Sequence, residues 1–363
     1  MNVRCLAGCA AVCVLTGLTS AETTEEHYKN IKVLTGHPAE DLVPTMQFVS
    51  AALGVDCDFC HVERAPEKDD KKEKQTARKM MTMTLAINRE SFEGRREVTC
   101  VTCHRGSTRP QAIPAIGLAS AAAAAPAAPP STASASADPI LEKYLKASGG
   151  AEALAKIATR SQKGKLTGFA PEPFPVEVFG KAPDKRISIV HAPRGDSITA
   201  FDGQSGWLSG GGRGAREMGA SEREAARLDA LLQFPRDLKT LFKEFRVAPS
   251  EPIDGRDATH LIARNEGRPP AELWFDAQSG LLLRQLRFAE TILGRNPTRV
   301  DYADYRAVDG VMVPFRWTVA RPGGSFTIQI DETQHNVPID DSRFAKPAPP
   351  PSEAPPPGEG KKG

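Results

Sequence analysis

Two short stretches of the sequence combine the residue types that attach haem. Both read Cys-x-x-Cys-His, the first over Cys57–His61 and the second over Cys100–His104. Two thiols three positions apart can form thioethers with the two vinyl groups on one porphyrin edge, and the imidazole that follows can ligate the iron; this is the signature of c-type haem attachment. The sequence therefore predicts two covalently bound c-type haems, with thioethers from Cys57, Cys60, Cys100 and Cys103 and iron ligands His61 and His104.

The same cysteines also allow a structural zinc site, two local disulfides or a redox-active dithiol. The interval from Cys60 to Cys100 is about twice the 15–20 residues usual between the C-x-x-C pairs of a zinc ribbon. Disulfides and dithiols require no histidine after each pair. All four cysteines after the first 21 residues belong to the two motifs, so haem attachment accounts for the pattern best.

The N-terminus has the pattern of an export signal. Arg4 precedes an apolar run over Cys5–Leu18, and small residues follow up to Ala21. A charged start, an apolar stretch and a small-residue cleavage point predict a signal peptide over residues 1–21. The run is shorter than the roughly 20 residues of a membrane-spanning helix, so an anchor is the weaker hypothesis, and lipidation at Cys9 stays open. We expect a periplasmic or otherwise exported protein, with membrane association left open.

The second axial ligand of each iron separates electron transfer from catalysis, because an iron closed on both sides offers no position to a substrate. Methionine is a common closing ligand in cytochromes c and raises the reduction potential. Apolar spacing and helix-ending residues predict helices from Pro44 to Gly54 and from Lys71 to Asn88. Met46 lies on the first of these helices and is the expected ligand of the first haem.

The second predicted helix carries three more methionines. Met80, Met83 and Ile87 share one face at i, i+3 and i+7. Met80 is the expected ligand of the second haem and Met83 its alternative. Ligation by Met81, or by a histidine from the N-terminal segment (His27 or His37), stays open, and core packing is the simpler role for any single methionine.

Charge excludes one class of partner. Lys and Arg total 47 against 45 Asp and Glu, a formal net charge of +2, which lacks the basic excess of a protein that binds nucleic acid. The charged stretch Glu67–Lys74 is expected to be a solvated helix start, with a docking patch for a redox partner as the alternative.

Composition divides the rest of the chain. Residues 111–137 are rich in Ala, Pro and Ser and predict a linker, so the halves on either side are expected to be loosely coupled. Residues 22–110 form the motif-bearing domain, residues 138–345 a second domain, and residues 346–363 a disordered Pro-rich tail.

The second domain shows alternating apolar stretches separated by turn signals such as Asp202-Gly203 and Asp309-Gly310. They predict an antiparallel sheet with short helices near residues 139–145 and 151–157 and a longer helix over residues 221–245. His191, His260 and His335 are dispersed, so no catalytic role is expected for them. The predicted strands cover residues 176–181, 186–191, 197–201, 259–263, 272–275, 281–287, 300–305, 311–320 and 325–331.

The motif-bearing segment, from about Ile31 to Pro110, resembles the cytochrome c subunit of bacterial photosynthetic reaction centres. In that family a helix before each C-x-x-C-H usually supplies an axial methionine, so the resemblance implies Met46 and Met80 as ligands. The family carries two such dihaem units, whereas this chain has one. The matching residues are Lys32-Val33-Leu34, Met46-Gln47-Phe48, Leu53–His61, Ala77-Arg78-Lys79-Met80, Ile87-Asn88 and Val98–Gly106.

The second domain is similar to the lipoprotein-carrier fold, a half-open barrel that accepts acyl chains. The similar stretches are Tyr305–Pro314 and Asn336–Asp340, which look like the closing strands of such domains. The resemblance implies an acyl-chain ligand for this domain.

These inferences predict an α + β multidomain protein, with a small α-helical dihaem cytochrome c domain followed by an antiparallel β half-barrel-like domain with a few helices. The leading function is electron transfer between redox partner proteins of the periplasm or membrane, without enzymatic activity. One alternative is a haem enzyme, a peroxidase or reductase, with one open iron site. The other is an acyl-chain-binding or lipoprotein-binding protein in which the haems act as a redox sensor.

Overall fold

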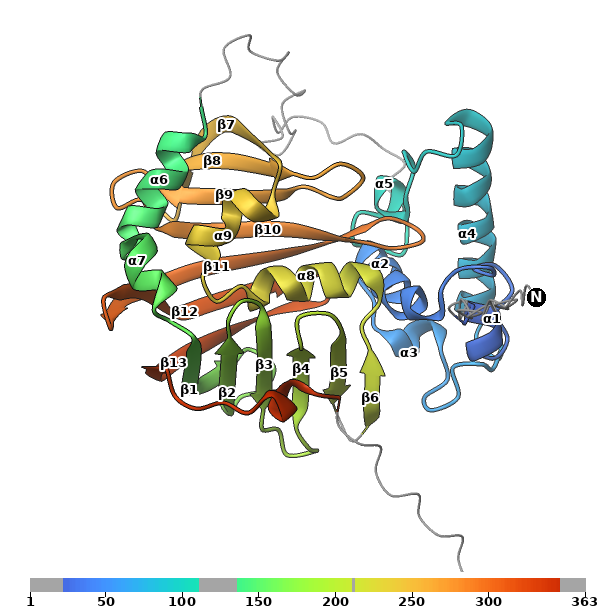
Figure 1. The fold of residues 1–363 in the computed structure, drawn as a ribbon. Coiled ribbons are helices and arrows are strands. Elements are labelled where there is room, and N and C mark those ends of the chain that lie inside the picture. Colours follow the sequence, from blue (N-terminus) through green and yellow to red (C-terminus); the bar gives the residue numbers. More distant parts are fainter. Residues whose placement is uncertain (1–21, 111–135, 211–212, 347–363) are drawn as a thin grey trace, which may run out of the picture.

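The computed structural model describes residues 22–110, 136–210 and 213–346. The predicted signal peptide with Cys9, most of the predicted linker and nearly all of the predicted tail lie outside these ranges. The described chain forms a group of short helices beside one large sheet (Figure 1). Within these ranges, no helix is both long enough and apolar enough to cross a membrane.

Helices make up the motif-bearing domain, and the two predicted ones are confirmed. The first ends at Gly54, whose left-handed backbone (φ 68°) suits a residue without a side chain. It begins at Leu42, which places Pro44 in the first turn, where no backbone N–H is needed. The elements are α1 (Thr24–His27), the 3-10 turn η1 (Ala39–Asp41), α2 (Leu42–Leu53), α3 (Cys57–Cys60), α4 (Lys72–Ser91) and α5 (Cys100–His104).

The second domain is a single antiparallel sheet of 13 strands in the order β6-β5-β4-β3-β2-β1-β13-β12-β11-β10-β9-β8-β7. Each strand from β1 to β6 and from β7 to β13 pairs with its neighbour in sequence, and the β1–β13 pairing joins the two runs. The strands are β1 (Thr159–Thr167), β2 (Phe174–Lys181), β3 (Lys185–Val190), β4 (Ser197–Phe201), β5 (Gly206–Gly210), β6 (Arg213–Glu217), β7 (Glu244–Ile253), β8 (Arg256–Arg264), β9 (Ala271–Asp276), β10 (Leu282–Glu290), β11 (Arg295–Val308), β12 (Val311–Arg321) and β13 (Gly324–His335).

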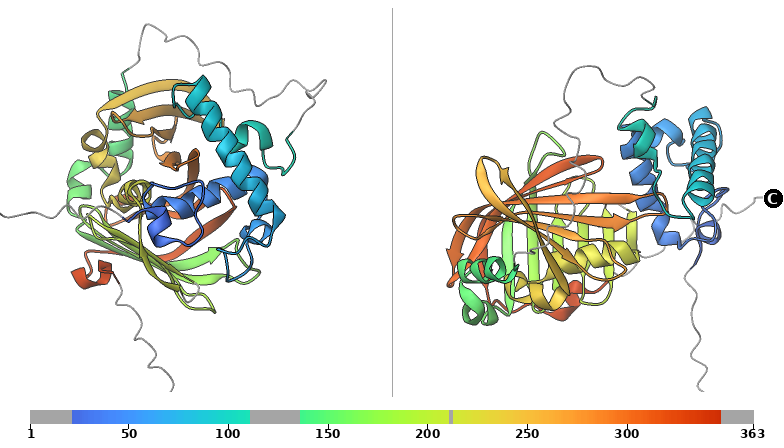
Figure 2. Two further views of the ribbon diagram at one scale, coloured as in Figure 1. Left: turned by 90° about the vertical axis from the view of Figure 1, so that its right-hand side faces the viewer. Right: turned by 90° about the horizontal axis from the view of Figure 1, so that it is seen from above.

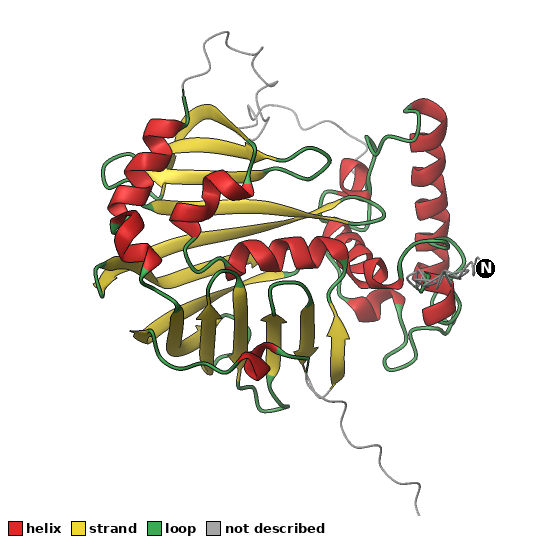
Figure 3. Cartoon of the chain, viewed as in Figure 1, coloured by secondary structure: helices red, strands yellow, loops and turns green. Residues whose placement is uncertain are grey.

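The sheet curls around helix α8 (Ala220–Ala230), which contacts both wings through β3, β4, β5 and β10 (Figures 1 and 2). Helices α6 (Asp138–Ala147), α7 (Gly150–Ala155) and α9 (Phe234–Leu241) lie toward the end of the sheet away from the motif-bearing domain (Figure 3). A 3-10 turn, η2 (Asp341–Phe344), follows the last strand. The predicted antiparallel half-barrel-like architecture is therefore confirmed.

Four strands were not predicted from the sequence, namely β1, β5, β6 and β7. Strand β1 does not alternate cleanly, because its register against β13 shifts between Lys163 and Gly164. A Cβ on Gly164 would lie 2.1 Å from the carbonyl oxygen of Gln329. Gly164 therefore marks a bulge, and the bulge interrupts the alternating pattern from which a strand is predicted.

The single helix predicted over residues 221–245 is wrong. The chain forms α8 and α9 instead, with Leu231–Gln233 between them, and Phe245 already belongs to β7. Pro235 lies in the first turn of α9, where proline starts a helix readily. The proline therefore marks a second helix start rather than a position inside one long helix.

The expected loose coupling of the two halves is also wrong, because α2 packs on the turn between β10 and β11. Ile292 and Leu293 of that turn share a core with Leu34, Leu42 and Phe48. The Ile292 amide donates to Thr45 Oγ1 at 3.1 Å, and Asn296 Nδ2 donates to the Pro44 carbonyl at 2.9 Å. Arg96 also pairs with Glu290. Folding thus joins two domains that composition alone had separated.

Gly294 provides a test of this docking. A Cβ there would lie 2.3 Å from Cζ of Phe48, whose side chain is buried. We expect Gly294→Ala to lower the free energy of unfolding by about 1–3 kcal/mol, the usual cost of an added carbon in a packed interface. Thermal unfolding of the full chain measures it. Gly214→Ala is the matched control, because a Cβ at Gly214 meets nothing within 4 Å; equal effects of the two changes would contradict this packing.

Candidate haem sites

Each C-x-x-C-H motif begins as a single helical turn, α3 for the first and α5 for the second. Residues three apart on a helical turn lie on the same side, so both thiols of a pair face one way. Thr99 stabilises the start of α5 through its amide, which donates to Thr102 Oγ1 at 3.0 Å. All four cysteines of the motifs are free thiols. Nothing in the described residues therefore supports the alternative of two local disulfides.

The histidines of the two motifs have the same kind of hydrogen-bond partner. The ring Nδ1 lies 3.0 Å from the Pro66 carbonyl oxygen in His61 and 2.9 Å from the Ser107 carbonyl oxygen in His104. A carbonyl only accepts hydrogen bonds, so Nδ1 carries the proton in both rings and Nε2 keeps its lone pair. A carbonyl behind the ring is the usual device that orients a metal-ligating imidazole. Both histidines thus fit iron ligation through Nε2.

The zinc and dithiol alternatives have no comparable support. Among residues 22–110, 136–210 and 213–346, no group of three or more His, Cys, Asp or Glu is placed to hold a metal ion together. Burial raises the pKa of the Cys60 and Cys100 thiols. A redox-active dithiol needs the opposite shift, because the thiolate is the reactive form.

A largely apolar pocket of about 240 Å³ adjoins the second motif. Met80, Met83 and Ile87 from α4 all line it, together with Met81 and other residues of that helix. Cys100, Cys103 and His104 of α5 form part of the wall, with Val49, Leu53, Phe59 and Cys60 completing it from α2 and α3. The pocket therefore combines the two thiols and the imidazole of the second motif with both candidate methionines.

The three methionines of α4 differ in burial. Met80 and Met83 are 37% and 45% exposed, whereas Met81 is 8% exposed and belongs to the core that includes Leu34 and Phe48. Met81 also lines the pocket but packs in that core, so the two exposed methionines, Met80 and Met83, are the better candidates for the second iron. One of the histidine alternatives, His27, already has a partner, because its Nδ1 lies 2.8 Å from a carboxylate oxygen of Glu22.

Met46 lies apart from this pocket. It is half-buried on α2, against the core that α2 shares with the β10–β11 turn. The end of α2 contacts the second motif, because the Gly106 amide donates to the Ala52 carbonyl at 2.8 Å, while α3 contacts α4. The assignment of Met46 to the iron at His61 stays a prediction.

Helix α4 anchors both motifs through buried polar residues that the sequence analysis did not single out. Asn88 accepts from the Val98 amide at 2.9 Å and donates to the Val98 carbonyl at 2.7 Å, just before the second motif. Lys74 donates to the carbonyls of Pro66, Glu67 and Lys68 at 2.7–3.1 Å, just after the first. Lys74, Met81 and Asn88 recur every seven residues, and this periodicity was the available signal for a buried face.

The Pro66 carbonyl therefore receives both the Lys74 ammonium and the His61 ring. Helix α4 begins only at Lys72, and Lys74 is 8% exposed, so the expectation of a solvated helix start is wrong for residues 67–71 and for Lys74. Asp69 adds to the same contacts, because its carboxylate accepts from Arg78 at 2.9 Å and from Asn30 at 2.8 Å. The loop that orients His61 is held by charge as well as by backbone geometry.

These contacts predict a pH dependence. Hydrogen bonds from Arg78, Asn30 and Lys74 hold the pKa of Asp69 well below its ordinary value of 3.8. The carboxylate therefore stabilises the fold above that value, and the stabilisation is lost as the pH falls through the lower folded pKa. We expect Asp69→Asn to lower thermal stability at pH 7 and to have a smaller effect below about pH 4. Melting curves across this pH range measure the effect. Asp70→Asn, a change at the exposed neighbour, is the control. An equal loss of thermal stability at every pH would contradict the ionic role of Asp69.

The segment with the two motifs and the pocket is similar to proteins of the cytochrome c class. Residues 13–142 match the family described as the photosynthetic reaction centre cytochrome C subunit. A photosynthetic reaction center cytochrome c subunit from Rubrivivax gelatinosus is 31% identical over 101 residues, which cover 26% of each chain. The resemblance inferred from the motifs is confirmed, and the aligned part is about a quarter of the length of that relative.

Solved structures similar to the β domain include members of the LolA superfamily. A LolA superfamily protein from Nitrosomonas europaea has a TM-score of 0.41 and 16% identity, covering 58% of this chain and 98% of its own. A putative outer membrane lipoprotein-sorting protein domain from Vibrio parahaemolyticus has a TM-score of 0.38 and 12% identity, covering 57% of this chain and 97% of its own.

Proposed function

We propose that this chain is a periplasmic dihaem c-type cytochrome that transfers electrons between redox partner proteins of the periplasm or membrane. The first haem would be held by Cys57, Cys60 and His61, with Met46 as second ligand. The second would be held by Cys100, Cys103 and His104, with Met80 as second ligand and Met83 as its alternative. Bound haem iron supplies a centre that alternates between the ferrous and ferric states without making or breaking bonds.

The observation that carries this proposal is the repeated environment of the two histidines. Two rings that lie 43 positions apart in the sequence each direct Nδ1 at a backbone carbonyl, at 3.0 and 2.9 Å. The Pro66 carbonyl is itself held by Lys74, which fixes the orientation of the His61 ring. Each histidine directly follows a pair of free thiols in the chain, as the attachment chemistry requires.

The test is an absorption spectrum of the full chain, matured in a host that attaches c-type haem, followed by extraction with acidified acetone. We expect two haems per chain that resist extraction and that titrate reversibly in a potentiometric experiment. Colourless protein, or pigment that the solvent removes, would reject the proposal. Export is checked on the same cells by fractionation, with the pigment expected outside the cytoplasm.

A haem enzyme is the second candidate, favoured by the exposure of Met80 and Met83 in the pocket beside His104. An iron that lacks a firmly held second ligand would accept a small molecule. Carbon monoxide added to the reduced protein discriminates the two, because a closed iron leaves the spectrum unchanged and an open iron shifts it.

For the β domain we propose a ligand with an acyl chain. The support is a cavity of about 480 Å³ on the inner face of the sheet. Apolar side chains line a large part of it, among them Leu166, Val178, Val190, Val319, Phe326 and Ile328.

A further inference from the structure

The cavity of the β domain is also lined by residues of the motif-bearing domain. Pro44 and Gln47 of α2 line it together with residues of the sheet and of α8. Pro44 is tied to the sheet through its carbonyl, which accepts from Asn296 Nδ2 at 2.9 Å. The helix that carries Met46 therefore forms one wall of the cavity, and a molecule inside would contact both domains.

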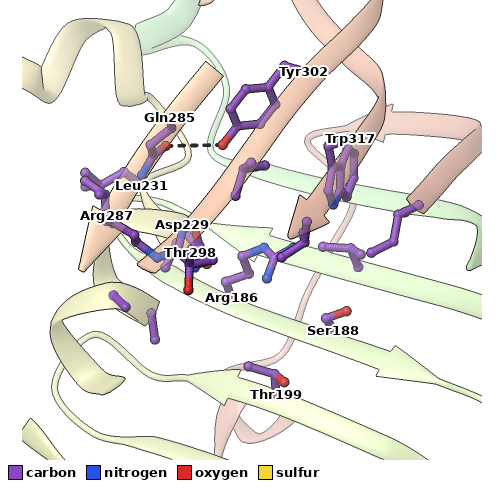
Figure 4. Close-up of a pocket in the computed structure, with 18 of the residues that line it drawn as sticks. Arg186, Ser188, Thr199, Asp229, Leu231, Gln285, Arg287, Thr298, Tyr302 and Trp317 are labelled. Atoms are coloured by element: carbon purple, nitrogen blue, oxygen red, sulfur yellow. Dashed lines mark hydrogen bonds and ion pairs between the residues drawn. The ribbon is translucent and has the colours of Figure 1, made fainter. Parts of the chain in front are cut away.

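In the cavity wall the carboxylates have ion-pair partners, whereas not every arginine has one. The two carboxylates there already have arginine partners, since Glu222 binds Arg216 through two contacts of 2.7 Å and Asp229 binds Arg287 at 2.5 and 2.6 Å. Arg186, from β3, lines the same cavity half-buried and has no hydrogen bond or ion pair to any residue that the structure describes. Arg321, which lies exposed at the end of β12, also lines the cavity without such a partner, and Arg160 donates through Nε to His335. Arg186 is therefore the half-buried guanidinium of the wall for which no described residue supplies a hydrogen bond or ion pair (Figure 4).

A buried amide donor in the same wall also lacks a partner. Gln285 is 2% exposed, and its Oε1 accepts from the Tyr302 hydroxyl at 3.2 Å. Its Nε2 has no hydrogen-bond partner among the described residues. A buried donor left unpaired costs free energy, so an acceptor within the cavity would stabilise the protein. Figure 4 draws Gln285, Tyr302 and Arg186 along this cavity.

We propose that the cavity binds an organic anion, a molecule with an apolar body and one carboxylate or phosphate group, and that Arg186 is its charge partner. A planar guanidinium offers paired donors that match the two oxygens of such a group. The apolar strands beside it receive the body of the ligand, and Pro44 and Gln47 of α2 lie in the same wall. This inference rests on the ligand proposed for the β domain and is independent of the haem chemistry.

The test is isothermal titration of the haem-loaded full chain at pH 7.5 with three probes, which are laurate, dodecanol and inorganic phosphate. We expect laurate to bind roughly tenfold more tightly than dodecanol, because only laurate offers an anion to the guanidinium. We expect Arg186→Gln to remove this preference and to leave dodecanol binding unchanged. Arg194→Gln is the matched control, since Arg194 is exposed in the turn that follows β3.

Each outcome separates this inference from the proposal on which it rests. If laurate and dodecanol bind equally to the unchanged protein, the acyl-chain proposal stands and the anion site is wrong. If neither binds, both are wrong. If inorganic phosphate binds as tightly as laurate and depends on Arg186, the site recognises a free anion and the apolar body is not part of the ligand. The comparison of probes on the unchanged protein tests the anion preference even if Arg186→Gln fails to fold. A laurate preference that survives Arg186→Gln would reject Arg186 as the charge partner, because Arg160 and Arg321 also line the cavity.

Discussion

Replacing Cys100 and Cys103 together by serine is expected to halve the covalently bound haem per chain. A hydroxyl cannot form the thioether that a thiol forms with a vinyl group, so the second motif loses attachment while the first keeps it. Haem absorbance measured against protein concentration after acid acetone extraction gives the ratio. The remaining pigment should show the spectrum and midpoint potential of the first haem alone.

The matched change is Cys57→Ser with Cys60→Ser. It should remove the first haem and leave the pigment and the midpoint potential of the second haem. Helix α3 of the first motif contacts α4, whereas α5 of the second motif contacts α2, so each motif is expected to keep its own haem when the other motif is changed. The variant lacking all four thiols should be colourless yet retain the circular dichroism of the sheet. Full pigment in either double variant would show that haem is attached elsewhere.

The helical half of the molecule was predictable because its signals are local. Gly54 ended a helix as expected, and the face containing Met80, Met83 and Ile87 lines one pocket. A helix is determined by residues three and four positions apart, so a single sequence contains most of the information. The core partners of Met81, which include Leu34 and Phe48, could not be predicted, because they belong to other elements of the chain.

Contacts that join distant parts of the chain were beyond the sequence. The packing of Phe48 on Gly294 and the bond from Ile292 to Thr45 span more than 240 residues. In the sequence, nothing distinguishes Arg186 from other strand residues. Its lack of an ion-pair partner depends on the pairing of Asp229 with Arg287, and that pairing forms only when the sheet curls. Sites formed between β strands depend on which strands become neighbours, and no periodicity encodes that.

Replacing Met80 by leucine is expected to change the spectrum of the second haem and to lower its midpoint potential. A thioether ligand favours the ferrous state, so its loss favours the ferric state. Axial ligands span a range of about 0.8 V in haem proteins, and the shift should be a measurable part of it. Potentiometric titration of the full chain measures it. The potential of the first haem is expected to shift less, because its expected second ligand, Met46, lies outside the pocket of Met80.

Met83→Leu is the matched control. Met83 lies three residues further along the same face of α4, lines the same pocket and is similarly exposed, at 45% against 37% for Met80. If only Met83→Leu shifts the potential, Met83 is the ligand and the helix presents its next turn to the iron. If neither change has an effect and carbon monoxide binds the reduced protein, the second iron is open, and the pocket formed by α4 and α5 is then a site for a small substrate rather than a relay for electrons.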